Sequence, residues 1–244
     1  MKRTEILSLM LLFTTALPAQ NSIPKGTILP VELNSSLNSG KNKVGQAIWA
    51  RIMQDVPLPG GAKIRAGTKV VGQVMEVKPA GSGNGASLAL RFEEVVISHR
   101  RIAITSNLRA LASAMEVWDA QIPLTGPDRG TPESAWTTVQ VGGDVVYRGG
   151  GPVTSGMEVV GEPTYKGVLA HTSSCQGGAS DNEPQALWVF SSNACGVYGL
   201  RHVSIVHSGR TDPVGEIELA SDHGEVKVDK ASGILLRVKS STER

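Results

Sequence analysis

SLALRFEEVVISHRRIAITSNLRAL, residues 87–111, alternates apolar and polar side chains over most of its length. Leu88, Leu90 and Phe92 fall on one face, and the same alternation resumes at Ile102. A period of two is typical of a strand with one face buried and the other in water. The stretch therefore predicts two half-buried strands, and an all-β fold class for the chain.

The preceding residues continue this pattern. Residues 27–33, 44–56 and 70–77 read as further strands, and Gln54 is the only polar break on the apolar face of the second. Glycine- and proline-rich turns separate them, as at residues 79–85. With 28 glycines, 13 prolines and 4% aromatic residues, the composition also favours an all-β protein, because closely spaced turns need residues with positive or restricted φ.

The first 19 residues have the pattern of a secretory signal peptide. Lys2 and Arg3 precede an apolar run over residues 6–17, and small residues follow up to Ala19. The run is shorter than the roughly 18 apolar residues that a membrane-spanning helix needs. We therefore expect cleavage after Ala19, a periplasmic or extracellular location, and no stable membrane insertion of the mature chain.

The charge balance bears on the class of partner. Removal of residues 1–19, which carry Lys2, Arg3 and Glu5, leaves 22 basic and 21 acidic residues. A nucleic-acid partner requires several phosphates to be neutralised at once, and therefore a basic excess. The near-neutral mature chain argues against nucleic acid, and we expect another cell-envelope protein as the partner, with the oligomeric state left open.

Two segments resemble a known family: IPKGTILPVELNSSLNSGKNKVGQAIWARIMQDV, residues 23–56, and KIRAGTKVVGQVMEV, residues 63–77. Their Gly-Thr strand openings and the Asp-Val strand end resemble the C-terminal β-barrel domain of the scaffold protein in type IV secretion and conjugation core complexes. The resemblance covers residues 23–111 and implies a small β-barrel, assigned to residues 23–112, with a role in assembly. The sequence shows none of that family's inner-membrane helix, proline-rich linker or pore-forming helical hairpin, so no pore is implied.

A helix and a linker are expected at residues 113–130. The segment SAMEVWDAQI opens with the capping-box pattern S-x-x-E, and Met115, Trp118 and Ile122 recur at helical spacing. The residues that follow, GPDRGTP, are typical of a turn or loop and mark the expected domain boundary. The chain is therefore expected to contain one short connecting helix between two β regions.

The second half, residues 131–240, is expected to be another all-β domain, either β-sandwich-like or a barrel. It opens with WTTVQVGGDVVYRGGG, where Gly142-Gly143 is the signal of a two-residue hairpin. Short apolar segments then recur about every nine residues, a rhythm that is typical of such folds. The last three are expected at residues 216–220, 225–229 and 234–238.

Cys175 and Cys195 are the only cysteines. In an exported chain an even pair predicts a disulfide, and the chain-entropy model gives about 3 kcal/mol for closing a loop of this length. The alternative is a nucleophilic Cys195, which would need a histidine base that is not near it in sequence.

Two loops are candidate docking surfaces. Asp128 and Arg129 lie in the linker, and Arg210 and Asp212 precede the closing strands. Arginine beside aspartate in a Pro/Gly-rich loop either makes local ion pairs that set the loop's shape or offers a binding surface on a rigid scaffold. Both interpretations remain open at this stage.

No catalytic constellation, metal-ligand spacing or cofactor motif stands out in the sequence. There is no G-x-S-x-G elbow, and His202 and His207, five apart on an expected strand, leave opposite faces. The leading hypothesis is therefore an exported, non-enzymatic binding or assembly module of the cell envelope, without catalytic residues, metal or cofactor. The alternative is a secreted hydrolase acting on polysaccharide or peptide, with Trp136, Trp188 and Tyr198 as sugar-stacking platforms.

Overall fold

The computed structural model describes residues 22–81, 85–124, 136–175 and 180–243. Apart from the single α-helix α1 (Ala114–Asp119) and the short 3-10 helix η1 (Pro59–Gly61), the regular structure in these ranges is β. The predicted all-β fold class is confirmed. No helix in these ranges is long and apolar enough to cross a membrane.

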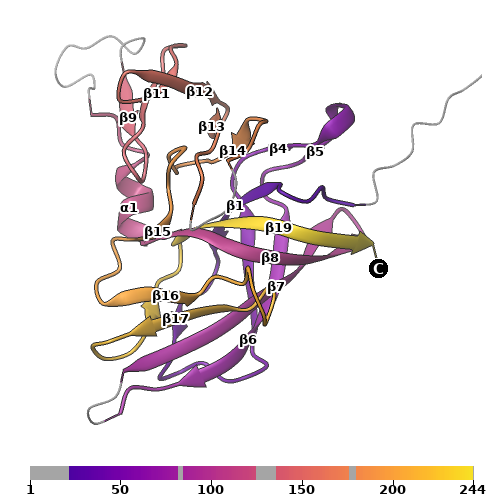
Figure 1. Ribbon diagram of the computed structural model, residues 1–244, viewed down its shortest axis with the longest axis vertical. Helices are drawn as coiled ribbons and strands as arrows, with labels where there is room; N and C mark the ends of the chain where they lie inside the picture. Colours follow the sequence, from indigo (N-terminus) through magenta and orange to yellow (C-terminus); the bar gives the residue numbers. More distant parts are fainter. Residues whose placement is uncertain (1–21, 82–84, 125–135, 176–179, 244) are drawn as a thin grey trace, which may run out of the picture.

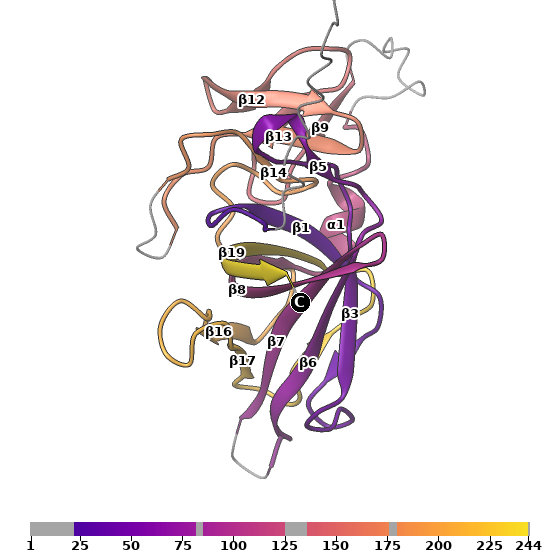
Figure 2. The ribbon, with the colours of Figure 1, turned by 90° about the vertical axis from the view of Figure 1, so that its right-hand side faces the viewer.

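Six antiparallel strands close into a barrel in the order β1-β3-β6-β7-β8-β19, with β8 pairing to both β7 and β19. The barrel occupies the middle and lower part of the molecule (Figures 1 and 2). Its strands are β1 (Ile28–Leu33), β3 (Ala47–Ile52), β6 (Lys69–Lys78), β7 (Ala86–Ile97), β8 (Arg100–Ala112) and β19 (Gly233–Glu243).

The stretch 87–111 forms β7 and β8, as its alternation predicts. The two strands pair next to their connecting turn, from Ile97 opposite Arg100 to Glu94 opposite Ala103, and then diverge. Beyond that point β17 (Ile217–Ser221) takes over as the neighbour of β7, and β15 (Gly196–Tyr198) lies parallel to the end of β8. The strand β16 (Val203–His207) pairs with β17 and ends the sheet on that side.

The barrel interior is a continuous apolar core. Leu88, Leu90 and Phe92 are at most 2% exposed, which confirms the buried face expected for this strand. Because each strand alternates, every barrel strand contributes residues at intervals of about two. The interior residues are Leu29, Val31, Leu33, Ile48, Ala50, Ile52, Val70, Val74, Leu88, Leu90, Phe92, Val95, Ile102, Ile104, Leu108, Leu111, Ile234, Leu236 and Val238.

A second sheet of six strands is a simple antiparallel meander on the outside of the barrel (Figure 2). Most of its strands are only two to four residues long. They are β9 (Thr137–Val139), β10 (Val145–Tyr147), β11 (Val153–Ser155), β12 (Glu158–Thr164), β13 (Gly167–Ala170) and β14 (Gln185–Ala186). Two small pairs complete the fold: β2 (Leu37–Asn38) with β18 (Lys227–Val228), and β4 (Val56–Pro57) with β5 (Lys63–Ile64).

The hairpin at Gly142-Gly143 is present, but its loop is longer than the predicted two residues. The backbone N–H of Gln140 donates to Asp144 O (2.8 Å), and β9 and β10 stop on either side of this bond. Val141 leaves the hairpin because its backbone pairs instead with the segment around Phe190. That long-range pairing is not visible in the local sequence, which explains the shorter expected loop.

The division between the two sheets does not coincide with the boundary expected at residue 131. The meander takes only residues 137–186, whereas β15, β16, β17 and β19 join the sheet of the first half. The reason lies in β19, because its Leu236 and Val238 fill the barrel interior. The expected second domain, residues 131–240, is therefore shared between the meander and the barrel sheet.

The meander and the barrel are joined by a second apolar core, called the junction core here. From the barrel side it takes the outward residues Ile28, Ala110, Ala112 and Leu235. From the other side it takes Val117 and Ala120 near α1, and Val141, Val146, Val153, Val168, Ala170, Leu187, Trp188, Val189, Phe190 and Ala194. The meander thus buries its apolar side only by lying on the barrel.

Helix α1 is shorter than the expected 113–122. Its N-cap Ser113 accepts a hydrogen bond from the backbone N–H of Glu116 (3.3 Å), as the capping pattern predicts. The face that packs inward carries Val117, whereas Met115 and Trp118 are more than half exposed. The expected linker beyond residue 124 lies outside the described residues.

Candidate functional site

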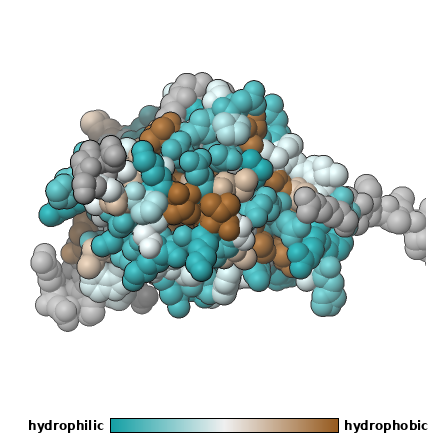
Figure 3. Space-filling model, turned by 90° about the horizontal axis from the view of Figure 1, so that it is seen from below, coloured by the Kyte–Doolittle hydropathy of each residue, from teal (hydrophilic) through white to brown (hydrophobic). Residues whose placement is uncertain are grey.

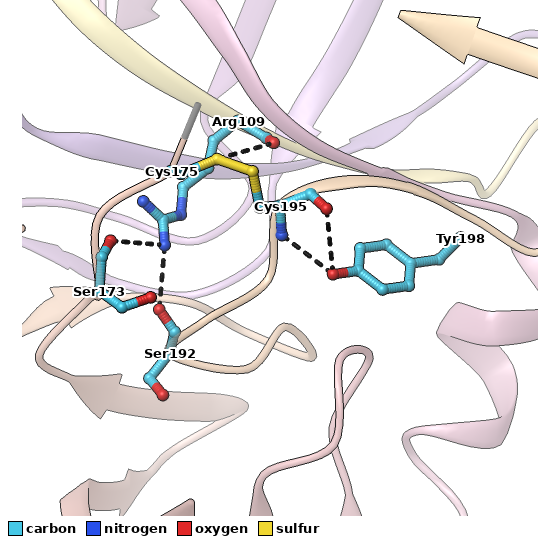
Figure 4. The surroundings of a disulfide bond; sticks show 6 residues. All are labelled: Arg109, Ser173, Cys175, Ser192, Cys195 and Tyr198. Atoms are coloured by element: carbon cyan, nitrogen blue, oxygen red, sulfur yellow. Dashed lines mark hydrogen bonds between the residues drawn. A yellow bond between two sulfur atoms is a disulfide. The ribbon is translucent and has the colours of Figure 1, made fainter. Parts of the chain in front are cut away.

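Cys175 and Cys195 form the predicted disulfide, with their Cα atoms 5.8 Å apart. The bond ties the segment after β13 to the segment before β15 (Figure 4). On the far side of Cys195, the Tyr198 hydroxyl accepts from the Cys195 backbone N–H (2.9 Å) and donates to its carbonyl (3.2 Å). Since both sulfur atoms are bonded, the alternative of a nucleophilic Cys195 thiol does not apply to this structure.

Arg109 lies beside the disulfide and is 1% exposed. Its Nη2 donates to the backbone carbonyls of Ser173 (3.1 Å) and Ser192 (3.0 Å), which belong to the two segments that the disulfide joins. Burial lowers the pKa of Arg109 to about 10, and the charges of Arg237 and Arg210 act in the same direction while Asp181 opposes them. The buried cation of Arg109, on barrel strand β8, therefore holds both segments that the disulfide joins.

Gln54 makes a second polar connection between barrel and meander. Its Nε2 donates to the carbonyl of Val168 (2.7 Å) and to Thr164 Oγ1 (3.1 Å). Its Oε1 accepts from the backbone N–H groups of Trp188 (2.7 Å) and Val168 (3.2 Å). The polar break in the strand pattern is thus a buried side chain that satisfies backbone groups of the meander.

A groove of about 700 Å³ lies between the meander and the segments at the start of β1 and around β4, and we call it the junction groove. The barrel side supplies residues 24–27 before β1 and residues 57–59 at the end of β4. The meander side supplies Leu169 and residues 181–185, which lead into β14. Four of the lining residues are prolines, which have no N–H to donate, so main-chain pairing along these walls is restricted.

A smaller cavity of about 360 Å³ adjoins this groove and shares Lys25 and Gly26 with it. We call it the cationic pocket. Its lining consists of Lys25, Gly26, Asn107, Arg210, Arg237, Val238 and Lys239. Four of these residues are cationic and none is acidic, so the cavity is suited to a negatively charged group.

The side chains of the cationic pocket are held in place by their neighbours. Arg237 makes an ion pair with Asp181, a residue that lines the junction groove. With its side-chain amide oriented so that both neighbours are satisfied, Asn107 accepts from Arg210 Nε (3.3 Å) and donates to the carbonyl of Arg237 (3.0 Å). Burial, and then the charge of Arg237, lowers the pKa of Arg210. The pocket therefore holds Arg210 beside a like charge that disfavours its charged form.

The predicted docking loops have different outcomes. Arg210 lies in the wall of the cationic pocket, and Asp212 is exposed two residues further on. Asp128 and Arg129 lie outside the described residues. Sequence reasoning missed Arg237 and Lys239, although these two cations at i and i+2 mark one face of the otherwise apolar first part of β19. It also missed their proximity to Lys25, which only the tertiary structure creates.

The aromatic residues of the hydrolase alternative do not form one exposed platform. Trp188 is 3% exposed and belongs to the junction core, so its ring is not available for stacking on a sugar. Tyr198 is partly buried, and its hydroxyl is bonded to Cys195. Trp136 is also partly buried. The expectation for Trp188 is therefore wrong.

The rest of the surface offers no comparable grouping of charged side chains around a metal site within the described ranges. Viewed from below, it is largely hydrophilic, with apolar side chains in small groups (Figure 3). Within the described ranges, no three histidine, cysteine, aspartate or glutamate side chains gather in a way that could hold a metal ion. Comparison with protein-family models and with curated proteins finds no match to this chain.

Proposed function

We propose that this chain is an exported, non-enzymatic binding or assembly module of the cell envelope, and that it holds a segment of another envelope protein in the junction groove. The observation that carries the proposal is the groove itself. At about 700 Å³ it has the size of a specific binding site, and it lies where the meander meets the segments that flank the barrel.

The closed barrel favours the groove over a barrel strand edge as the docking surface. Each of the six barrel strands has hydrogen-bonded neighbours on both sides, so the barrel offers little backbone for a partner strand to extend. The groove draws on residues 24–27 and 57–59 from the first half and on residues 181–185 from the second. A partner would therefore contact both halves, and would not depend on residues 23–111 alone.

Export is part of the same proposal. The apolar run within residues 1–19 and the Cys175–Cys195 disulfide both support an oxidising compartment outside the cytoplasm. Intact-mass analysis of the protein from its host should find an N-terminus at Gln20 in the periplasmic or extracellular fraction. An unprocessed Met1 in the cytosol would contradict export.

Resemblance to an assembly scaffold supports the choice of partner class. It covers residues 23–111, which form five of the six barrel strands, and it suggests a role in a larger envelope assembly. The hydrolase alternative has less support, because Trp188 is buried and no catalytic grouping was identified in the sequence.

Photo-crosslinking in intact cells tests the proposal. A photoreactive residue is placed at Pro59 or Asn182, which are exposed on the two walls of the groove, and as a control at Lys41 or Val44, which are exposed on a barrel turn. Both groove positions should crosslink to the same envelope protein, and the control positions should not. Crosslinks from the control positions alone, or glycan hydrolysis by the purified protein that is lost on replacing one carboxylate, would overturn the proposal.

A further inference from the structure

The outer face of the barrel changes character along β8, β19 and β1. Near the meander it is apolar, with Ala110 and Leu235 in the junction core. Further along the same strands it becomes cationic and polar, with Arg237 and Lys239 on β19 and Asn107 opposite Arg237 on β8. The cationic pocket therefore begins where the cover of the meander ends.

Two segments from elsewhere in the chain complete the pocket with further cations. Arg210 comes from the connection between β16 and β17, which is tied to the barrel by the bond from Leu108 N to Ser208 O (2.8 Å). Lys25 comes from the segment before β1, which is tied to β19 by the bond from Gly26 N to Val238 O (2.8 Å). Four cations from three separate segments thus converge on one cavity.

This convergence carries an electrostatic cost. Burial, and then the charge of Arg237, lowers the pKa of Arg210, and Arg237 acts in the same direction on Arg109 behind the pocket. Asp181 is the carboxylate that pairs with Arg237, and it does so from the wall of the groove. Like charges that are held together at a cavity are a recurrent feature of functional sites, where a bound ion of opposite sign relieves the repulsion.

The charge pattern also constrains the rest of the ligand. Among the lining residues of the adjoining groove, Glu183 faces the single cation Lys25, and the charge of Asp181 is already paired with Arg237. A ligand with negative charges along its whole length would find no excess of positive charge there. The pattern fits a ligand with one negative end and a neutral or basic body, which describes a peptide better than a nucleic acid or a polyanionic glycan.

We propose that the cationic pocket binds a carboxylate of the peptide segment that lies in the junction groove, with Arg210 and Lys239 as its principal contacts. This inference rests on the proposed function, because the groove must hold the peptide. The planar fork of an arginine matches the two oxygens of a carboxylate, and the Asn107 amide holds that fork from behind. The carboxylate is either the C-terminus of the peptide or an Asp or Glu side chain.

The test uses three pools of random peptides that differ only in their carboxylates. One pool has a free C-terminus and no acidic residue, a second has an amidated C-terminus and one Asp or Glu, and a third has neither. Binding of the first or the second pool, with none of the third, is expected, and the pool that binds identifies the source of the carboxylate. The protein variants used with these pools keep Arg237, because it forms an ion pair with Asp181.

The variant Arg210→Gln/Lys239→Gln should weaken this binding by about tenfold or more, since it removes two charged donors. The matched control Lys41→Gln/Arg65→Gln removes two exposed cations outside the pocket and should leave the affinity unchanged. Both variants should keep the circular dichroism spectrum and the melting temperature of the parent protein, so a change in affinity reports on binding.

Several results would overturn the inference. Equal binding of all three pools, or no effect of Arg210→Gln/Lys239→Gln, would show that the pocket does not recognise a carboxylate. If a peptide nevertheless binds in the groove, the proposed function still stands. Tighter binding of inorganic phosphate than of any carboxylate peptide would assign the pocket to another anion. If no pool binds, the inference fails, and the crosslinks from Pro59 and Asn182 decide separately whether the proposed function fails with it.

Discussion

The barrel and the meander bury their apolar surfaces in different ways. Barrel strands of six to thirteen residues wrap around their own core, so the sheet has its apolar face covered once it closes. Most meander strands have two to four residues, and their apolar side lies on the outside of the barrel. The barrel is thus self-contained in its packing, whereas the meander depends on the barrel and on three tethers: Gln54, Arg109 and the disulfide.

The difference extends to the surface. Val159 in the meander is more than half exposed, and Met157 and Tyr165 at its turns are fully or nearly fully exposed. A short sheet with one packed face has little means of covering such side chains. Seams between a rigid element and a tethered one are also where binding sites are expected, and both the junction groove and the cationic pocket lie beside this seam.

Deletion of residues 233–244 should have the largest effect, because it removes β19 and opens the barrel. The loss of Leu236 and Val238 from the interior, and of pairing along β1 and β8, should exceed the total stability of about 5–15 kcal/mol that a typical domain has. Circular dichroism and limited proteolysis should show an unfolded chain. Deletion of residues 242–244 is the control and should leave the fold intact; a folded product from the longer deletion would refute the barrel's dependence on β19.

Phe92→Ala and Phe190→Ala form a matched pair, because both side chains are fully buried, one in the barrel interior and the other in the junction core. Each should cost about 3–5 kcal/mol, the usual cost of emptying a buried phenylalanine site. Denaturant titration of Phe92→Ala should show the loss in global unfolding. Phe190→Ala should instead increase hydrogen exchange mainly in residues 137–186. Equal loss of protection in both sheets for both variants would mean that the molecule is one cooperative unit.

The sequence predicted the barrel better than the meander for a physical reason. Alternation is a local signal, and it located β7 and β8 and the buried face of Phe92. Closure by β19 pairs residues more than one hundred positions apart, and such pairing leaves no local mark. The same holds for the pocket, since Arg210 was identified from its loop chemistry whereas Arg237 and Lys25 become neighbours only through the fold.

Two other features were partly visible in the sequence. The disulfide followed from the presence of one pair of cysteines, and it is confirmed. Gln54 was recognised as a break in a strand, but its role required the backbone of Val168 and Trp188 to be in place. For α1, the spacing of Trp118 predicted a helix but did not reveal which side of the helix faces the core, and Trp118 is in fact exposed.

Gln54→Ala should cost about 1–3 kcal/mol, because it leaves buried backbone groups of Val168 and Trp188 without their partners. The loss should appear as faster hydrogen exchange in the meander. Gln73→Ala, whose side chain donates to Glu93 in a less buried part of the barrel, is the control and should change stability by less than about 0.5 kcal/mol. A similar loss of stability for both variants would show that Gln54 does not tether the meander to the barrel.

Asp55→Asn should have the smallest effect. Lys63, first through its hydrogen bond, and then the backbone N–H of Ala66 lower the pKa of Asp55 below 3.8. The ionised carboxylate therefore contributes stability that is fully present above the unfolded-state pKa and is lost as the pH falls through the lower folded-state pKa. The variant should be less stable at neutral pH by no more than about 0.5 kcal/mol, given the exposure of the pair, and the difference should disappear on acidification below 3.8. A difference that grows in acid would reverse this assignment.

The central claim is that a self-contained barrel carries a tethered meander. Hydrogen exchange measured residue by residue, before and after reduction of Cys175–Cys195, tests it most directly. Opening a loop of this length should remove about 3 kcal/mol of constraint, so exchange should rise across residues 137–170 and 185–190, while β1, β3, β6 and β7 keep their protection. Loss of protection in the barrel strands in step with the meander, or no change in the meander, would contradict the claim.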